Sequence, residues 1–180
     1  DILPDHFRLD EEALWFDKLT ERRDGESDVQ PQRICSPLRV TAITCDSHDG
    51  SYGRLLEWHT TTGQLRRWAM PMAMLSGNGE ELRRILLENG LTYISTRPAL
   101  RSLLCEYISR SLPGRRVTCV EKTGWHCGVY VLPDEVIGPD GDSVILQGSH
   151  YLTGGFAQAG TLAEWQEQVA ALCTGNSRLV

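Results

Sequence analysis

The chain has 180 residues, of which 41% are hydrophobic and 23% are charged, a composition that is typical of a globular protein and excludes a disordered one. No apolar run approaches the roughly 20 residues of a membrane-spanning helix, and the acidic N-terminus does not resemble a signal peptide. We therefore expect a cytoplasmic protein with no membrane partner. The first residue is not Met, which favours a segment of a longer chain.

The formal net charge of −6 comes entirely from the first 30 residues. Residues 1–30 hold ten acidic and four basic residues, whereas residues 31–180 hold the remaining 14 acidic and 14 basic residues. Net acidity weakly disfavours a dedicated nucleic-acid-binding protein, but the neutral main body can still present a basic face.

Residues 1–32 predict an acidic N-terminal hairpin followed by a loop. Residues 7–9 and 13–17 are short apolar runs on either side of three consecutive acidic residues, so we expect them to pair. Residues 21–32 are polar and contain Gly and Pro, which indicates a loop. The main domain is then expected to span residues 33–176.

Residues 38–70 predict a three-stranded antiparallel meander. Apolar and polar residues alternate over 38–43, and a turn-rich run that ends in Asp49-Gly50 follows. Residues 52–59 and 64–70 supply the second and third strands. Together with the helices below, this meander predicts an α+β fold.

About three helices are predicted after the meander. Asn78 is the expected N-cap of the first helix, which Gly90 ends. Pro98 lies in the first turn of the second helix, and a strand over 91–94 separates the two. The third helix begins at the capping box Thr161-Leu162-Ala163-Glu164, with Leu162, Trp165, Val169 and Leu172 on one face.

Residues 115–138 hold the densest set of chemically capable side chains. Residues 117–121 and 129–132 predict two strands, and the intervening turn carries Trp125-His126-Cys127 between two glycines. A Trp between glycine-flanked strands usually covers a sheet, so we expect Trp125 in the core. If its ring is exposed instead, it is placed to stack on a base. A further strand is expected over 143–147.

Basic residues are concentrated between Arg97 and Lys122, a segment with six basic and two acidic residues. Arginines beside exposed aromatic rings suit contact with a nucleic-acid backbone and its bases. The alternative is a solvated helix face with Glu106 and Arg110 as an ion pair. The candidate nucleic-acid-binding residues are Arg97, Arg101, Arg115, Arg116, Lys122 and Trp125.

Metal and nucleophile sites are the competing interpretations. Cys119, His126 and Cys127 could contribute to a zinc site, but adjacent residues of a strand point in opposite directions. A Cys–His nucleophile pair would join Cys119 or Cys127 to His59 or His150. Neither phosphate-binding glycine motif occurs in the chain.

A metal-dependent enzyme would need clustered carboxylates. The dense acidic residues of the main body lie in turn-like sequence, where solvated loop acids are the usual interpretation; they are Asp134, Glu135, Asp140 and Asp142. We therefore expect no metal, no cofactor and no catalytic residue in this chain.

Four segments resemble one known family: KTGWH…GVYVLPDEVIG, ICSPLRVTAIT, GRLLEWHTTTGQLRRWAMP and LAEWQEQVAALCTGNSRLV. They are similar to the domain-of-unknown-function family 927, and the resemblance covers residues 7–180. Its members are primase/helicase-like proteins of phages, plasmids and integrative elements. The resemblance implies that a helicase-type ATPase, which would bind ATP and Mg²⁺, follows this segment, and residues 177–180 resemble its start.

The resemblance implies a non-catalytic accessory domain of a mobile-element helicase or primase-helicase. Such a domain would contact DNA, its own ATPase domain or a replication protein, and would form homo-oligomers through the motor. The first alternative is a protein-docking module with Trp15 and Trp165 as anchors. The second is a metal-dependent nuclease or primase-like enzyme.

Overall fold

The structure is a computed structural model that describes residues 3–21, 27–132, 135–147, 160–168 and 171. The chain divides into two compact units, residues 1–148 and 149–180. These limits do not coincide with the predicted boundaries at residues 33 and 177. The described residues confirm the predicted α+β fold and show strands in antiparallel and mixed sheets.

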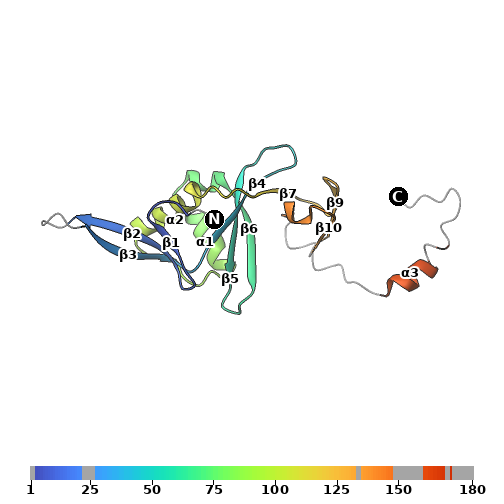
Figure 1. The fold of residues 1–180 in the computed structure, drawn as a ribbon, viewed down its shortest axis with the longest axis horizontal. Helices are drawn as coiled ribbons and strands as arrows, with labels where there is room; N and C mark the ends of the chain where they lie inside the picture. Colours follow the sequence, from blue (N-terminus) through green and yellow to red (C-terminus); the bar gives the residue numbers. More distant parts are fainter. Residues whose placement is uncertain (1–2, 22–26, 133–134, 148–159, 169–170, 172–180) are drawn as a thin grey trace. The chain divides into compact units, whose positions relative to one another are not determined.

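The largest sheet has five strands in the order β11-β7-β4-β5-β6 (Figure 1). The antiparallel strands β4 (Arg39–Cys45), β5 (Gly53–His59) and β6 (Leu65–Pro71) confirm the predicted meander. β7 (Arg116–Val120) and β11 (Val144–Leu146) extend it, and both make parallel pairs that the sequence analysis did not predict. Parallel pairing joins distant segments, so no local pattern marks it.

One face of this sheet packs on two helices, α1 (Glu80–Glu88) and α2 (Pro98–Arg110). The shared core is fully or nearly fully buried and includes Leu56, Trp58, Met70, Leu86 and Leu104. The phenol of Tyr107 donates a hydrogen bond of 3.0 Å to the carbonyl oxygen of Leu38, which ties α2 to the residue before β4. The two predicted helices are therefore confirmed.

The start of α1 differs by one residue from the prediction. Gly79, not Asn78, is the N-cap, with a φ of 69°. A Cβ on Gly79 would lie 2.5 Å from the Sγ atom of Cys105, so only glycine fits between α1 and α2. Residues 91–94 are not a strand, because Ile94 makes only an isolated bridge to Cys35.

The opposite face of the five-stranded sheet carries two alanines among larger apolar side chains. Ala42, Leu55, Ala69 and Val117 form a second buried cluster. The side-chain amide of Gln147, just after edge strand β11, donates 2.7 Å to the carbonyl oxygen of Ala69 in the other edge strand, β6. The sheet is therefore curled, and small residues suit its concave side.

A second sheet contains β1 (Phe7–Leu9), β2 (Leu14–Glu21) and β3 (Ser27–Cys35), all antiparallel. The predicted loop over 21–32 is wrong where it meets β3, which pairs with β2 along its length. Its polar sequence lacks an apolar face, so the pairing alone defines it as a strand. The predicted separate acidic hairpin is not confirmed, because Phe7 and Leu14 belong to the same core as the helices.

The third sheet is small and has the order β10-β9-β8, with β8 (Gly124–His126), β9 (Val129–Val131) and β10 (Val136–Ile137). Cys127 and Gly128 form the two-residue turn between β8 and β9, with φ values of 49° and 84°. Positive φ at both positions matches the favoured hairpin turn. The predicted turn around Trp125 is therefore a strand, and β7 pairs elsewhere.

The described part of the second unit contains α3 (Leu162–Gln168). Its predicted capping box is present: the amide of Thr161 donates 2.8 Å to Glu164, and the amide of Glu164 donates 3.3 Å to the Thr161 hydroxyl. The predicted apolar positions 169 and 172 lie outside the residues whose side chains are described. None of the helices in the described ranges is long and apolar enough to cross a membrane.

Candidate nucleic-acid interface

A hollow of about 820 Å³ lies beside the start of β7. Three arginines line it: Arg67 of β6, Arg115 just before β7, and Arg116, the first residue of β7. The rest of its wall includes residues 138–146, which contain the short 3₁₀ turn η2 (Gly141–Ser143) and β11. Arg115 and Arg116 were predicted from the sequence, but Arg67 was not, because it reaches the hollow only through the non-local strand order.

Two of these arginines have fixed partners. The Nε of Arg67 lies 3.0 Å from a carboxylate oxygen of Glu57, and the Nη2 of Arg115 donates 2.6 Å to the carbonyl oxygen of Asp142. Arg116 is exposed. The guanidinium of Arg115 thus holds the wall of the hollow in place while its other N–H groups stay available to an anion.

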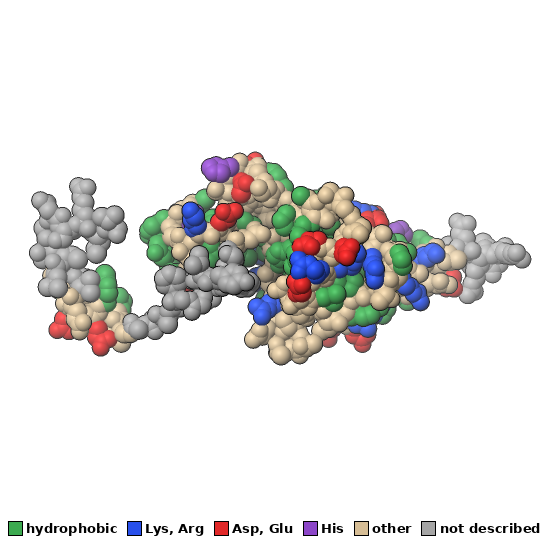
Figure 2. All heavy atoms as spheres, turned by 180° about the vertical axis from the view of Figure 1, so that it is seen from behind, with side chains coloured by type: hydrophobic (Ala, Val, Ile, Leu, Met, Phe, Trp, Pro, Cys, Tyr) green, Lys and Arg blue, Asp and Glu red, His purple; other side chains and the backbone are tan. Residues whose placement is uncertain are grey.

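Carboxylates line the same hollow. Glu135, Asp140 and Asp142 are among its lining residues, so the three arginines are offset by acidic side chains. Figure 2 likewise shows basic and acidic side chains interleaved on the face it displays. Among the described residues, no three His, Cys, Asp or Glu side chains are grouped as metal ligands would be. Position 134, the remaining predicted acid, lies outside the described residues.

The six predicted binding residues do not form one surface. Arg97 precedes the first turn of α2 and is exposed, and the Nε of Arg101 donates 3.3 Å to the carbonyl oxygen of Ser95. Arg115 and Arg116 come after the end of α2, whose 13 residues span about 20 Å. Near that end Arg110 pairs with Glu106 at 3.0 Å, as the solvated-face alternative predicts.

Trp125 is not in the core: 75% of its surface is exposed. Its ring packs edge-on against Tyr130, with centroids 5.3 Å apart and planes at 71°. The expectation of a buried ring is wrong because Val129 and Val131 already fill the inner face of this sheet. Alternation along the strands then directs Trp125 and its partner Tyr130 outward.

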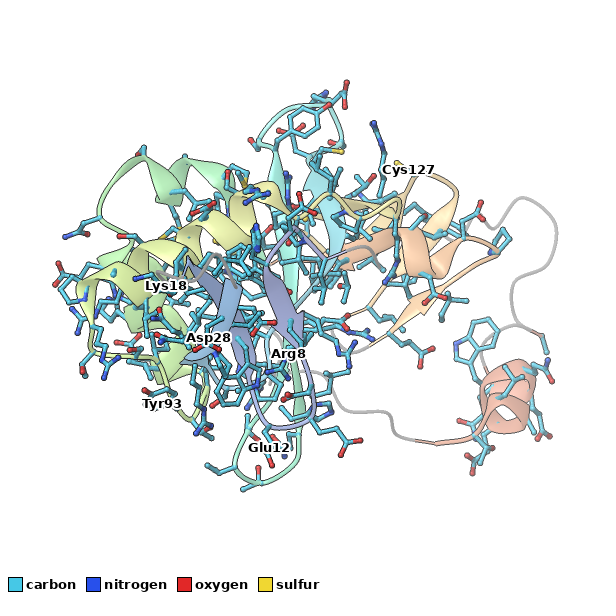
Figure 3. All side chains as sticks on the ribbon, turned by 60° about the vertical axis from the view of Figure 1, so that its left-hand side comes forward. Arg8, Glu12, Lys18, Asp28, Tyr93 and Cys127 are labelled. Atoms are coloured by element: carbon cyan, nitrogen blue, oxygen red, sulfur yellow. The ribbon has the colours of Figure 1, made fainter. Side chains whose placement is uncertain are left out.

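The neighbours of Trp125 are polar and exposed. A ring nitrogen of His126, Nε2, lies 2.8 Å from the carbonyl oxygen of Lys122, which fixes the start of the hairpin. Lys122 is exposed, and Cys127 lies at the exposed tip of the same hairpin (Figure 3). The hairpin and the residue before it therefore present the cation of Lys122 and the rings of Trp125 and Tyr130 to solvent.

The cysteine–histidine alternative has weak chemical support. Burial raises the pKa of the Cys119 thiol to about 11 and that of Cys35 to about 12, so neither is a ready thiolate. Cys127 is exposed at a turn, and the Nε2 of its neighbour His126 is engaged by Lys122. Position 150 lies outside the described residues.

The predicted docking anchors differ from each other. Trp15 is only partly exposed, and the guanidinium carbon of Arg8 lies 5.4 Å from the centre of its ring (Figure 3 labels Arg8). Trp165 of α3 is 47% exposed. A cross-strand pair was not predicted: Leu19 in β2 and Val29 in β3, which are 54% and 51% exposed. Leu19 lies beyond the predicted strand over 13–17, and Val29 lies in the segment predicted to be a loop.

The chain is similar to a known family and to a solved structure. No curated protein matches the chain. A solved structure described as "SCCmec type IV Cch - active helicase" matches with a TM-score of 0.53 and 15% identity, over 92% of this chain and 29% of that one. At this identity the likeness shows the fold alone, and the chain spans under a third of that helicase. The family model described as "Domain of unknown function (DUF927)" matches residues 7–180, so the chain belongs to that family.

Proposed function

We propose that this chain is a non-catalytic accessory domain of a mobile-element helicase or primase-helicase, and that it contacts DNA. The fold likeness to a chain described as an active helicase, of which this chain spans 29%, supports such a context. An ATPase that binds ATP and Mg²⁺, oligomerises and contacts replication proteins would then belong to the rest of the parent protein.

The observation that carries DNA contact is the hollow lined by three arginines: Arg67 of β6, Arg116 of β7, and Arg115 just before β7. Guanidinium groups bind phosphate oxygens through two parallel hydrogen bonds, and several of them fix the path of a backbone. Carboxylates in the same wall limit the net attraction, so we expect modest affinity that falls steeply with salt.

A salt titration of DNA binding tests this proposal. Each phosphate contact that Arg67→Ala, Arg115→Ala or Arg116→Ala removes should lower the slope of log affinity against log salt by about 0.7–0.9. The matched control is Arg84→Ala, because Arg84 is held by Glu81 and Glu88 at 2.7 Å on the surface of α1. Arg97→Ala and Arg101→Ala test whether the start of α2 contributes as well.

Two results would contradict DNA contact. One is the absence of measurable binding to single-stranded and double-stranded DNA at low salt. The other is binding by the three hollow variants that is as tight and as salt-dependent as that of the unmodified chain.

A protein-docking role is the second candidate, and the exposed pair Leu19 and Val29 favours it. Leu19 and Val29 face each other on the antiparallel pair of β2 and β3, which we call the β2–β3 arm, and such apolar side chains suit an apolar partner surface. Leu19→Asp should then lower the mass of any self-associated species in sedimentation, whereas Leu112→Asp, at another exposed leucine, should not. Equal masses for the two variants would rule out self-association through the arm.

The enzyme alternative is tested directly. We expect no cleavage and no primer synthesis when the chain is incubated with DNA, nucleotides and Mg²⁺ or Mn²⁺. If activity is seen and Glu135→Gln or Asp142→Asn abolishes it, the acidic wall of the hollow is catalytic and the proposed non-catalytic role is wrong.

A further inference from the structure

Three side chains form a row across the outer face of the small sheet. Trp125 of β8 pairs with Tyr130 of β9, and Tyr130 pairs with Ile137 of β10. Paired residues of neighbouring strands point to the same face, so all three lie side by side. Their exposed fractions are 75%, 36% and 51%.

The opposite face of the same sheet explains why the row faces outward. Val129 and Val131 are 1% and 0% exposed and pack with Val120 and Val144 of the five-stranded sheet. A two-layer arrangement usually leaves polar side chains on the outside of such a sheet. Here the described outer residues Trp125, Tyr130 and Ile137 are apolar, and the largest apolar patch on a protein surface is often functional.

The size of the row limits its occupant. Three partly exposed side chains of this kind present on the order of 300 Å². A stable protein interface, including one with a second copy of this chain, buries about 800 Å² on each partner. The row is therefore too small for a stable protein interface, but it is large enough for one or two nucleic-acid bases to stack on it.

The geometry of the rings suits bases. Neighbouring strands lie about 4.8 Å apart, and Trp125 contacts Tyr130 at 71° while 75% of its surface stays exposed, so at least one face of the Trp ring is open to solvent. Every base has a flat π-face, so stacking on such a ring tolerates any sequence. Bases are free to stack in this way only when the nucleic acid is single-stranded.

The charges around the row are mixed, so stacking of bases on the rings, and not attraction of phosphates, would supply most of the affinity there. Lys122 is exposed at the start of the hairpin, but Glu121 beside it and Glu135 before β10 are exposed as well. Two arginines of the hollow, Arg115 and Arg116, lie at the other end of β7, whose five residues span about 17 Å. A short single strand could therefore contact both regions, with phosphates at the hollow and bases on the row.

We propose that the outer face of the β8–β9–β10 sheet is a base-stacking platform for single-stranded DNA, centred on Trp125 and Tyr130. This inference rests on the proposed DNA contact and adds the form of DNA and the groups that hold it.

The test measures binding of the whole chain to an oligothymidine strand and to a duplex of the same length. Trp125→Ala should weaken single-strand binding by about 5- to 150-fold, and Trp125→Phe should keep most of it. Tyr130→Ala should weaken it less. The salt slope should stay unchanged in these variants, because no phosphate contact is lost. Trp165→Ala, at an exposed ring in the other unit, is the matched control.

Several outcomes overturn the platform while leaving the proposed function standing. Single-strand binding by Trp125→Ala and Tyr130→Ala that equals the unmodified chain, while Arg116→Ala binds weakly, places the contact at the hollow alone. An equal loss for strand and duplex excludes stacking. Self-association of the chain that Trp125→Ala abolishes makes a second copy the occupant. Absence of binding to any DNA would instead reject the proposed function itself.

Thermal melting of each variant shows whether a loss of binding is caused by unfolding. Because the Trp125 ring is exposed, its replacement should leave the melting temperature within about 2 °C of the unmodified chain, as for other surface changes. A large drop in melting temperature would mean that the row serves packing, and the platform would be wrong.

Discussion

The five-stranded sheet and the small β8–β9–β10 sheet obey the same alternation rule with different results. In the large sheet one face packs on the helices, and the other buries its own side chains Ala42, Leu55, Ala69 and Val117 beside the hollow. In the small sheet only the inner face is covered, by a cluster of valines. The large sheet therefore provides the stability of the unit, and the small one can present side chains to a ligand.

Two tryptophans that look alike in the sequence illustrate this difference. Trp58 and Trp125 both lie in short strands, but Trp58 is 2% exposed and its indole nitrogen donates 3.2 Å to the carbonyl oxygen of Asn89. Trp125 has only Tyr130 as a ring partner among the described residues. If burial governs stability, substitutions in the large sheet should cost more free energy of unfolding than substitutions in the small sheet.

The largest effect is expected in the core of the large sheet. Leu104 of α2 is fully buried, so Leu104→Ala should lower the free energy of unfolding by about 2–5 kcal/mol. Urea denaturation followed by circular dichroism measures this loss. Leu112→Ala, at a leucine that is 72% exposed, should change it by less than about 0.5 kcal/mol. Similar losses of unfolding free energy in the two variants would mean that burial of Leu104 contributes little to stability.

A smaller and local effect is expected in the small sheet. Val131→Ala should destabilise the hairpin by about 1–3 kcal/mol, because it removes buried methyl groups from a cluster with few other members. Hydrogen exchange should then quicken for β8 and β9 while α2 keeps its protection. Ile137→Ala, on the exposed face of the same sheet, is the matched control. Equal acceleration in α2 would show that the two regions unfold together.

The turn between β8 and β9 should become more stable when Cys127 is replaced by glycine. Cys127 has a φ of 49°, where a side chain is strained and glycine is not. Cys127→Gly should therefore raise the stability of the hairpin by about 0.5–1 kcal/mol, measured by hydrogen exchange of β8 and β9. Cys127→Val should lower it. A gain with valine would contradict the assigned turn.

The smallest effect is expected at the turn between β4 and β5, and only in acid. The amides of Gly50 and His48 donate 2.9 and 2.8 Å to Asp46, which lowers the pKa of its carboxyl below the usual value. Because the folded-state pKa is the lower one, this stabilisation is present above the unfolded-state pKa and is lost as pH falls through the folded-state pKa. Melting temperatures over about pH 2–6 should fall less for Asp46→Asn than for the unmodified chain. Parallel curves for the two proteins would contradict this.

Local patterns predicted most of the described helices and the meander. Turn residues, capping residues and Pro98 mark the ends of these elements directly in the sequence, as the Thr161–Glu164 contacts show. β3 was missed because its residues carry no apolar alternation, and pairing with β2 alone makes it a strand.

The candidate site was less predictable because it depends on strand order. Arg67 joins Arg115 and Arg116 only because β7 is inserted beside β4 in the curled sheet. The exposure of Trp125 depends on which face the valines cover, and nothing near Trp125 in the sequence states that. Such features follow from pairing across long separations rather than from local propensity.

The parallel pairing of β7 with β4 has a consequence for synthesis of the chain on the ribosome. Ile43 pairs with Arg116, and the meander ends at Pro71, so 45 more residues must be added before the partner of β4 begins to appear. At about 5–20 residues per second, the outer edge of β4 stays without a partner for roughly 2–9 s. An unpaired edge is a site of wrong pairing between chains. Nascent chains halted after α1 should therefore aggregate or recruit chaperones more than chains halted after β11, which co-sedimentation of ribosome-bound chains would measure.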